Sequence, residues 1–236
     1  MEINSKLNMR IVKKIQSHGA NSSLYIVEDT QLNEIFMLKQ IDKNKIKESS
    51  KYFDEVRNVK DIENKNIVKI NYATYDDDNI YISMPYYKNG SLQDILQERN
   101  LTVREIVKYS LEILSGLYYI HKKNILHCDI KPSNILIDDY GCAVLADFGS
   151  AININHSGVG KLKNVYYKHI APEQCYSSRV DVRVDIYQFG NTLYRMCNGE
   201  EEYNKQVKKS KNMTELKNAI VNGSFPSRKK YYPHIP

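Results

Sequence analysis

Apolar and polar residues alternate along the first 42 residues in three short runs. The runs lie around Ile11, at residues 24–27 and at residues 35–38. Such alternation predicts β-strands that bury one face, and the small, turn-forming residues 17–23 predict a hairpin loop between the first two strands. The pattern therefore predicts three strands at the start of the chain, with Lys39 at the end of the third.

Further along, the apolar spacing changes between helix and strand. Residues 52–62 have a helical spacing, and residues 66–70 and 80–84 read as two strands joined across an acidic turn. Ser91 is a predicted N-cap of a short helix. Residues 102–123 have the longest helical spacing, which predicts a long, largely buried helix with no chemistry of its own.

Composition and charge narrow the function classes. The 236 residues are enough to bury a core in one large domain or two small lobes. The net charge of +6 is spread along the chain, so its basic runs read as solvated faces and no nucleic-acid partner is expected. Four cysteines show no zinc-like spacing, and no apolar run approaches the roughly 18 residues that span a bilayer. We therefore expect a reducing, cytoplasmic setting and no membrane segment.

Chemistry-bearing side chains are concentrated after the long helix. Residues 127–134 read H-C-D-I-K-P-S-N, and D-F-G follows at residues 147–149. Asp129, Asn134 and Asp147 thus offer three oxygen-bearing side chains at short spacing. Mg²⁺ prefers oxygen ligands and is usually completed by substrate phosphates. Two of these side chains therefore suit a magnesium site, and one suits a proton acceptor.

The stretch resembles the catalytic loop and metal-binding turn of the protein kinase family, which read H-R-D-L-x-x-x-N and D-F-G. The resemblance implies that Asp129 orients the substrate hydroxyl and takes its proton, and that Asn134 and Asp147 bind Mg²⁺. Lys131 matches the serine/threonine form of the loop, in which it neutralises charge on the γ-phosphate of ATP. Leu136, in the short strand that follows, would lie against the adenine.

The resemblance continues before the catalytic loop, at positions that bind the nucleotide in protein kinases. Lys39 resembles the lysine of V-A-I-K, with Glu55 as its partner, although a lysine at a strand end also extends readily to water. Met37 stands where the family usually has an alanine over the adenine. The other positions are those of the glycine-rich loop, the hinge and the ribose: Ser17, Gly19, Ser22, Leu24, Met84, Pro85, Tyr87 and Ser91.

Two of these assignments have an equally good structural explanation. An ordinary hairpin turn would also give the small residues at 17–22, and Ser91 can simply cap its helix.

In the hinge, Met84 takes the gatekeeper position, and adenine would bind the carbonyl of Pro85 and the N–H of Tyr87. Proline lacks an N–H but keeps its carbonyl, so it does not disrupt this hinge.

Later motifs agree with the family, with departures. A-P-E stands at residues 171–173, and Asp185 resembles the aspartate that holds the catalytic-loop backbone. Cys128 replaces the arginine that usually pairs with a phosphate on the activation segment, so we expect activity that does not depend on phosphorylation of that segment. Tyr166 replaces the usual threonine, and Ser157 is a candidate phosphosite in the same segment.

The end of the chain departs as well. The final helices of the large lobe and the arginine partner of Glu173 do not appear before residue 236. We therefore expect either a naturally short large lobe, or a fragment that needs a partner to complete it or tolerates a looser lobe.

These motifs cover roughly residues 10–200 and imply a two-lobed α+β protein kinase fold. The predicted domains are a small antiparallel β lobe that binds ATP (1–87) and a mostly helical, truncated lobe for catalysis and substrate (88–236). The implied function is transfer of the γ-phosphoryl group of ATP, with Mg²⁺, to protein Ser/Thr hydroxyls. Two alternatives stay open: a pseudokinase that binds nucleotide or protein, and a small-molecule phosphotransferase of the aminoglycoside type, a class that usually lacks A-P-E.

Overall fold

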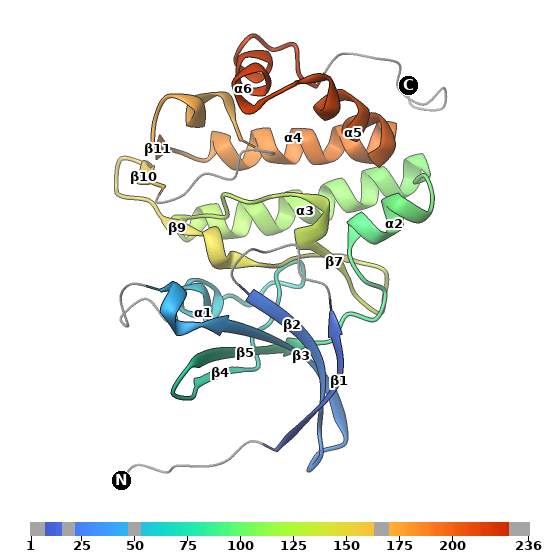
Figure 1. Ribbon diagram of the computed structural model, residues 1–236, viewed down its shortest axis with the longest axis vertical. Coiled ribbons are helices and arrows are strands. Elements are labelled where there is room, and N and C mark those ends of the chain that lie inside the picture. Colours follow the sequence, from blue (N-terminus) through green and yellow to red (C-terminus); the bar gives the residue numbers. More distant parts are fainter. Residues whose placement is uncertain (1–7, 16–21, 47–52, 163–169, 227–236) are drawn as a thin grey trace. The chain divides into compact units, whose positions relative to one another are not determined.

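The computed structural model describes residues 8–15, 22–46, 53–162 and 170–226 (Figure 1). The chain divides into two compact units. The first holds Met1–Glu63 and Val68–Tyr87, and the second holds Asn64–Ile67 and Lys88–Pro236. A short segment of the N-terminal part, Asn64–Ile67, therefore belongs to the second unit.

The first unit is built on an antiparallel sheet of five strands, in the order β1-β2-β3-β5-β4 (Figure 1). β2 pairs antiparallel with β1 on one side and with β3 on the other, and β5 lies between β3 and β4. The strands are β1 (Met9–Ile15), β2 (Ser22–Asp29), β3 (Glu34–Asp42), β4 (Tyr72–Tyr75) and β5 (Asn79–Pro85). The unit also contains α1 (Asp54–Val59) and a short 3₁₀ turn, η1 (Lys43–Lys45).

Alternation along the strands buries one face of this sheet, as the sequence predicts. Val27 of β2 and Ile80 and Ile82 of β5 are fully buried. The predicted acidic turn joins β4 to β5, and Asp76 closes it through Oδ1, which accepts from the N–H groups of Asp78 (2.9 Å) and Asn79 (2.7 Å). Aspartate favours turns because its side chain bonds to nearby backbone in this way.

The predicted elements of this unit differ from the structure at their ends. Lys39 lies inside β3, which continues to Asp42, so Lys39 does not end the strand. The helix α1 ends at Val59, before Ile62, and Tyr52 lies outside the described residues. An apolar spacing marks buried positions, and a helix can stop while the chain that follows still buries its apolar side chains.

The strand expected at residues 66–70 is wrong, since β4 is the strand that pairs with β5. Asn66 bonds within the second unit instead. Its Nδ2 donates to the Ala143 carbonyl (2.9 Å), and its own carbonyl accepts from the Leu145 N–H (2.8 Å). Ile67 is only 5% exposed, so its side chain is buried without a place in a multi-residue ladder.

The second unit is mostly helical, and its two longest helices, α3 and α4, lie side by side (Figure 1). Its helices are α2 (Leu92–Glu98), α3 (Val103–Lys122), α4 (Arg183–Asn198), α5 (Glu200–Lys209) and α6 (Met213–Val221). Short antiparallel pairs complete it: β6 (Ile125–Leu126) with β9 (Ile152–Asn153), β7 (Ile135–Ile137) with β8 (Ala143–Leu145), and β10 (Gly160–Lys161) with β11 (Arg179–Val180). Within its described residues, 3₁₀ turns lie between these strands: η3 (Pro132–Asn134), η4 (Phe148–Ser150) and η6 (Pro172–Cys175). Among the described helices, none is long and apolar enough to cross a bilayer.

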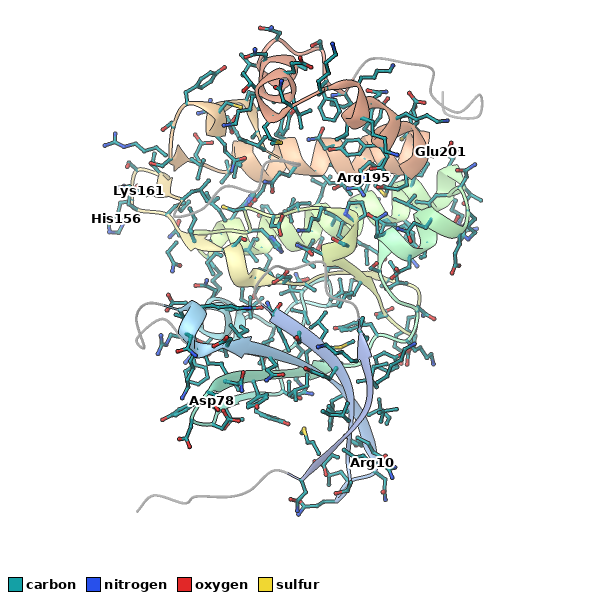
Figure 2. The ribbon with its side chains drawn as sticks, in the orientation of Figure 1. Arg10, Asp78, His156, Lys161, Arg195 and Glu201 are labelled. Carbon is teal, nitrogen blue, oxygen red and sulfur yellow. The ribbon has the colours of Figure 1, made fainter. Side chains whose placement is uncertain are left out.

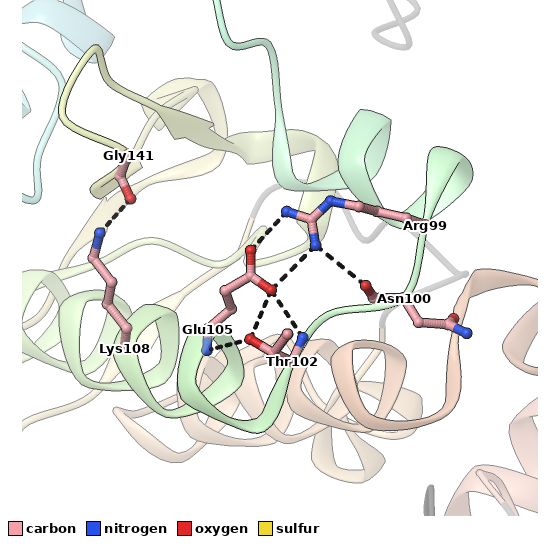
Figure 3. A network of polar contacts seen from close by, with 6 residues as sticks. All are labelled: Arg99, Asn100, Thr102, Glu105, Lys108 and Gly141. Carbon is pink, nitrogen blue, oxygen red and sulfur yellow. Dashed lines mark hydrogen bonds and ion pairs between the residues drawn. The ribbon is translucent and has the colours of Figure 1, made fainter.

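The long helix α3 begins at a capping box. The Thr102 hydroxyl accepts from the Glu105 N–H (3.3 Å), and the Glu105 carboxylate accepts from the Thr102 N–H (2.8 Å). Arg99 donates to both oxygens of the same carboxylate, at 2.6 and 3.1 Å (Figure 3). This network satisfies backbone donors at the helix start and joins the end of α2 to α3.

Only one stripe of α3 is buried. Ile113, Leu117 and Ile120 are at most 1% exposed, and each such side chain stabilises the fold by about 1.5–3 kcal/mol. Val107 and Leu111 are 52% and 64% exposed. The prediction of a largely buried helix is therefore wrong, because apolar residues also occupy the solvent face.

A buried arginine joins three helices of this unit. Arg195 of α4 is 4% exposed, and its Nε donates to the Glu200 carboxylate at the start of α5 (2.7 Å). The same guanidinium donates to Gln93 of α2 and lies 4.9 Å from the centre of the Tyr203 ring. Figure 2 labels Arg195 within this helical region. A buried charge needs such partners, so the cluster fixes how these helices pack.

Candidate active site

The first unit contains a buried ion pair at the predicted position. Lys39 of β3 donates through Nζ to both carboxylate oxygens of Glu55 in α1, each at 2.8 Å. The two side chains are each 10% exposed, so little water screens the pair. Pairing of this kind is what makes a buried lysine tolerable, and the expected Lys39–Glu55 contact is present.

The strand register places other predicted nucleotide positions beside this pair. Leu24 of β2 lies directly opposite Lys39 of β3. Met37 lies opposite Met84 of β5 and two residues before Lys39, so it shares a face of the sheet with the lysine. Pro85 ends β5, and Tyr87 is the last residue of this unit.

Of the three predicted positions in the loop between β1 and β2, only Ser22 lies within the described residues. Ser22 is the first residue of β2 and lies opposite Ile41 of β3. Ser17 and Gly19, the other two predicted loop positions, lie outside the described residues, as does Tyr166. Their predicted roles stay predictions.

In the second unit, the side chains of Asp129, Lys131 and Asn134 meet within one loop. Lys131 Nζ donates to Asp129 Oδ2 at 2.7 Å. Asn134 Nδ2 donates to the same Oδ2 and to the Asp129 backbone carbonyl, both at 2.9 Å. Asp129 is 5% exposed, and both partners of its carboxylate belong to the same loop. Such charge-assisted bonds fix the carboxylate in one orientation.

The backbone of this loop is held by hydrogen bonds to Asp185 of α4. Asp185, with no exposed surface, accepts from the His127 N–H (2.9 Å) and the Cys128 N–H (2.7 Å). The predicted role of Asp185 as a holder of the catalytic-loop backbone is therefore seen directly. His121 of α3 bonds the same carboxylate through Nε2 at 2.8 Å.

His127 itself is structural in the way the sequence suggests. Its Nε2 lies 3.0 Å from the Ala146 carbonyl, so Nε2 carries a proton and donates. Its ring centre lies 4.6 Å from that of Phe148. The residue is completely buried, and this geometry leaves it no reacting partner.

Cys128 is an inert part of the loop. Its backbone has a positive φ of 64°, which is uncommon for a residue other than glycine. Burial, and then the nearby carboxylates of Asp185 and Asp129, raise the pKa of the Cys128 thiol well above its usual range. The thiol therefore stays protonated and is a poor nucleophile.

Asn134 and Asp147 suit a magnesium site by donor chemistry. The Ala146 N–H donates to the Asn134 carbonyl at 2.9 Å, which brings Asp147 next to the end of the loop. Asn134 uses Nδ2 toward Asp129, and its Oδ1, which accepts a long hydrogen bond from the Ser133 hydroxyl (3.5 Å), is the side-chain oxygen that suits a hard cation. Asp147 has a left-handed backbone, with φ of 61°, and such conformations are common at functional sites. The described residues contain no cluster of three or more His, Cys, Asp or Glu that could hold a metal. In proteins, Mg²⁺ is usually held by one or two carboxylates, several waters and substrate phosphates.

Ser91 and Leu136 lie side by side. They form an isolated antiparallel bridge, and the hydroxyl of Ser91 is engaged in the capping box of α2, where it donates to Asp94 Oδ2 at 2.7 Å. Leu136 is partly exposed, whereas its strand neighbours Ile135 and Ile137 are buried. The strand thus buries one face and leaves Leu136 on the other.

The sequence matches the family described as the protein kinase domain over residues 11–234, nearly the whole chain. The chain belongs to the protein kinase family. The five-stranded antiparallel sheet and the helical second unit are those of a protein kinase fold. Members of this family use ATP and Mg²⁺ and phosphorylate proteins.

Several serine/threonine kinases are similar to this kinase domain. The serine/threonine-protein kinase CLA4 of Candida albicans is 30% identical over 82% of the chain and 20% of its own length. A probable serine/threonine-protein kinase of Clostridium acetobutylicum is 32% identical over 86% of the chain and 32% of its own. The 3-phosphoinositide-dependent protein kinase B of Dictyostelium discoideum is 33% identical over 77% of the chain and 21% of its own. The chain therefore spans about a fifth to a third of the length of these relatives.

One contact of the kinase loop is missed by sequence reasoning. Gln188 of α4 is 2% exposed, accepts from the Ile130 N–H (2.8 Å) and donates to the Cys128 carbonyl (3.1 Å). It lies three residues after Asp185 and so on the same face of α4. A polar residue on the buried stripe of a helix was the available signal.

Proposed function

We propose that this chain is an ATP-dependent protein kinase that phosphorylates serine and threonine hydroxyls of proteins. The observation that carries the proposal is the buried carboxylate of Asp129, held by Lys131 and Asn134. Phosphoryl transfer depends mainly on positioning and electrostatic stabilisation. A fixed carboxylate beside a lysine supplies both at the point where a hydroxyl would react.

In this proposal, Asp129 orients the substrate hydroxyl and takes its proton as the oxygen attacks the γ-phosphorus of ATP. The new oxygen–phosphorus bond forms as the bond to the β,γ-bridging oxygen breaks, and ADP leaves with that electron pair. Lys131, 2.7 Å from the same carboxylate, offsets negative charge on the transferred group. Asn134 and Asp147 would hold Mg²⁺, which neutralises phosphate charge when bound.

Most of the proposed nucleotide contacts come from the first unit, and those of Ser91 and Leu136 come from the second. Lys39 binds the α- and β-phosphates while Glu55 holds its ammonium group, a role that their 2.8 Å pairing supports. Adenine contacts are proposed for Leu24, Met37, Met84, Pro85 and Tyr87, together with Leu136, a ribose contact for Ser91, and phosphate contacts for Ser17, Gly19 and Ser22. Residues 1–87 are accordingly the proposed ATP-binding lobe, and residues 88–236 the catalytic and substrate lobe.

Two sequence motifs favour serine and threonine of proteins as substrates, and the state of the cysteines favours a reducing location. The A-P-E motif at residues 171–173 is usually absent from small-molecule phosphotransferases. Lys131 favours serine and threonine over tyrosine. All four cysteines are free, which is the usual state in the cytoplasm.

The test is label transfer from γ-³²P-ATP with Mg²⁺ to a generic protein, followed by phosphoamino-acid analysis. We expect label on serine and threonine, lost in Asp129→Asn and in Asp147→Asn. Asp139→Asn is the matched control, because Asp139 is an exposed carboxylate on the loop between β7 and β8. It should keep wild-type transfer.

The alternatives give different results in the same assay. Label on amines or sugars but never on protein would replace this proposal with a small-molecule phosphotransferase. Nucleotide binding without transfer to any acceptor would indicate a pseudokinase. Transfer that survives Asp129→Asn would contradict the assigned role of that carboxylate.

A further inference from the structure

The solvent face of α3 carries a row of apolar and small side chains with a cation at each end. Its members follow one another at steps of three or four residues, so they lie along one face of the helix. We name this row the α3 stripe, and it consists of Arg104, Val107, Leu111, Ser115, Tyr118 and Lys122. All of them are exposed, and the three apolar ones expose between 52% and 64% of their surface.

The packing of the second unit does not account for these apolar side chains. The buried contacts of α3 are made from its opposite side, through Ile113, Leu117 and Ile120. A single exposed apolar residue is ordinary, but a row of them rimmed by polar groups marks an interaction surface. A second helix suits this surface, because its own side chains recur at the same spacing.

The charge of the α3 stripe is positive at both ends. The two carboxylates of α3 lie off the stripe and bond elsewhere. Glu105 accepts from Arg99 and Thr102 (Figure 3), and Glu112 Oε2 accepts from the Ala143 N–H at 2.7 Å. At the other end, Lys122 Nζ lies 4.8 Å from the centre of the Tyr118 ring. A partner with carboxylates at its ends therefore complements this surface.

The spacing of the two end cations sets the length of a matching partner. Arg104 and Lys122 are separated by about five turns of helix, or about 27 Å along the axis. A partner helix of this length would place one charged side chain beside each cation. Its apolar side chains would then lie over Val107, Leu111 and Tyr118.

A second copy of α3 matches the stripe in shape but not in charge. In an antiparallel pair of stripes, Leu111 of one copy would face Ser115 of the other, and Val107 would face Tyr118. The same arrangement puts Arg104 against Lys122 at both ends, and a parallel arrangement puts each cation against itself. Like charges placed against each other exclude a partner. Self-pairing is therefore disfavoured, and a partner of opposite charge is favoured.

We propose that the α3 stripe binds an amphipathic helix of another protein, whose apolar side chains are flanked by a carboxylate at each end. The apolar side chains pack along the middle of the stripe, where the small side chain of Ser115 allows a close approach. The carboxylates pair with Arg104 and Lys122. Such exposed pairs contribute little affinity, but they select the partner and its register.

The test uses the full-length protein and two synthetic probes. Both are alanine-based helical peptides with leucines at the spacing of the stripe. One carries glutamate, and the other lysine, at the positions that face Arg104 and Lys122. Fluorescence anisotropy measures the Kd of each peptide. We expect the glutamate probe to bind about tenfold more tightly at low salt, because two attractive pairs replace two repulsive ones.

Charge reversal identifies the groups responsible. Arg104→Glu with Lys122→Glu should reverse the preference, so that the lysine probe binds more tightly. The control is Lys208→Glu with Lys209→Glu, which changes the net charge equally at exposed positions of α5 and should keep the preference for glutamate. Leu111→Gln should weaken binding of both probes. All substituted side chains are exposed, and circular dichroism checks that the fold is kept.

Several outcomes would overturn the proposal. They are the absence of binding by either probe, equal binding of the two, or a preference that reversal at Arg104 and Lys122 does not change. Self-association of the wild type in sedimentation velocity, lost in Leu111→Gln, would assign the stripe to a second copy instead. The readout is binding, so failure of the proposed kinase reaction would leave every one of these results unchanged.

Discussion

At the residue scale, the position of the buried Asp129 carboxylate depends on the residues that hold the backbone of its loop. Asp129 makes its own contacts within the loop, but the backbone that carries it is fixed by Asp185 and Gln188 of α4. Gln188 satisfies one donor and one acceptor of this backbone, and both are buried. Gln188 is therefore a positioning residue for Asp129.

Replacing Gln188 by leucine should both destabilise the protein and slow phosphoryl transfer. The change leaves the Ile130 N–H and the Cys128 carbonyl without their partner, which costs about 1–3 kcal/mol per buried group. Denaturant titration measures the stability loss, and kcat should fall more than KM rises. Gln97→Leu, at an exposed position of α2, is the control and should change neither. Equal effects of the two variants would refute the positioning role.

At the element scale, α3 is the scaffold of the second unit, and Gly116 permits a close approach of α3 to β8 and to the segment around Asn66. A Cβ built on Gly116 would meet Leu145 Cδ1 at 2.8 Å and the Asn66 carbonyl oxygen at 2.9 Å. The backbone oxygen cannot move away as a flexible side chain can. A side chain at this position would therefore separate α3 from β8 and from the segment around Asn66.

Two glycine-to-alanine changes should have opposite signs. Gly116→Ala should lower the free energy of unfolding by about 1–3 kcal/mol, since the overpacking exceeds the gain in helix propensity. Gly190→Ala, in α4, meets nothing within 4 Å and should raise it by up to about 1 kcal/mol. Denaturant midpoints measure both values. Stabilisation by both variants would contradict the close contact at Gly116.

The start of α3 should give the protein a pH-dependent component of stability. The hydrogen bonds from Arg99, and next those from the Thr102 N–H and hydroxyl, lower the pKa of Glu105 from 4.5 to about 2 against the opposing effect of burial (Figure 3). A carboxyl group with a lowered pKa stabilises the fold above its unfolded pKa. This stabilisation is lost as the pH falls from about 4.5 toward 2.

Glu105→Gln should therefore cost about 1 kcal/mol at pH 7, a value reduced because the side chain is partly exposed to water. The difference between wild type and variant should shrink as the pH falls from 4.5 toward 2. Thermal unfolding across this range measures it, with Glu98→Gln as an exposed control. A difference that stays constant with pH would show that charge at Glu105 is not the cause.

At the scale of the whole molecule, the sequence predicts what is local and misses what depends on packing. The loop at 127–134 and the D-F-G turn were recognisable because their chemistry lies within a few residues. The Lys39–Glu55 pair was also predicted, since a lysine among apolar residues needs a partner. Gln188 was missed, because one polar residue on a helix does not reveal which backbone it meets.

The errors of element prediction have a common cause. Residues 66–70 are apolar enough for a strand, yet Asn66 bonds to β8 and Ile67 is buried beside it. Val107 and Leu111 fit a helical stripe but face solvent. Apolar spacing says that a side chain can be buried, and only the packed chain decides which ones are.

Asp129 is proposed to act in phosphoryl transfer and to have little part in binding the nucleotide. The most direct measurement compares wild type and Asp129→Asn in two quantities, the rate of γ-phosphoryl transfer to protein and the Kd for ATP with Mg²⁺. We expect Asp129→Asn to lower the transfer rate by a factor of about 10²–10⁴, the usual contribution of a positioned acid or base, and to change the Kd little. An unchanged transfer rate, or equal losses in rate and affinity, would contradict it.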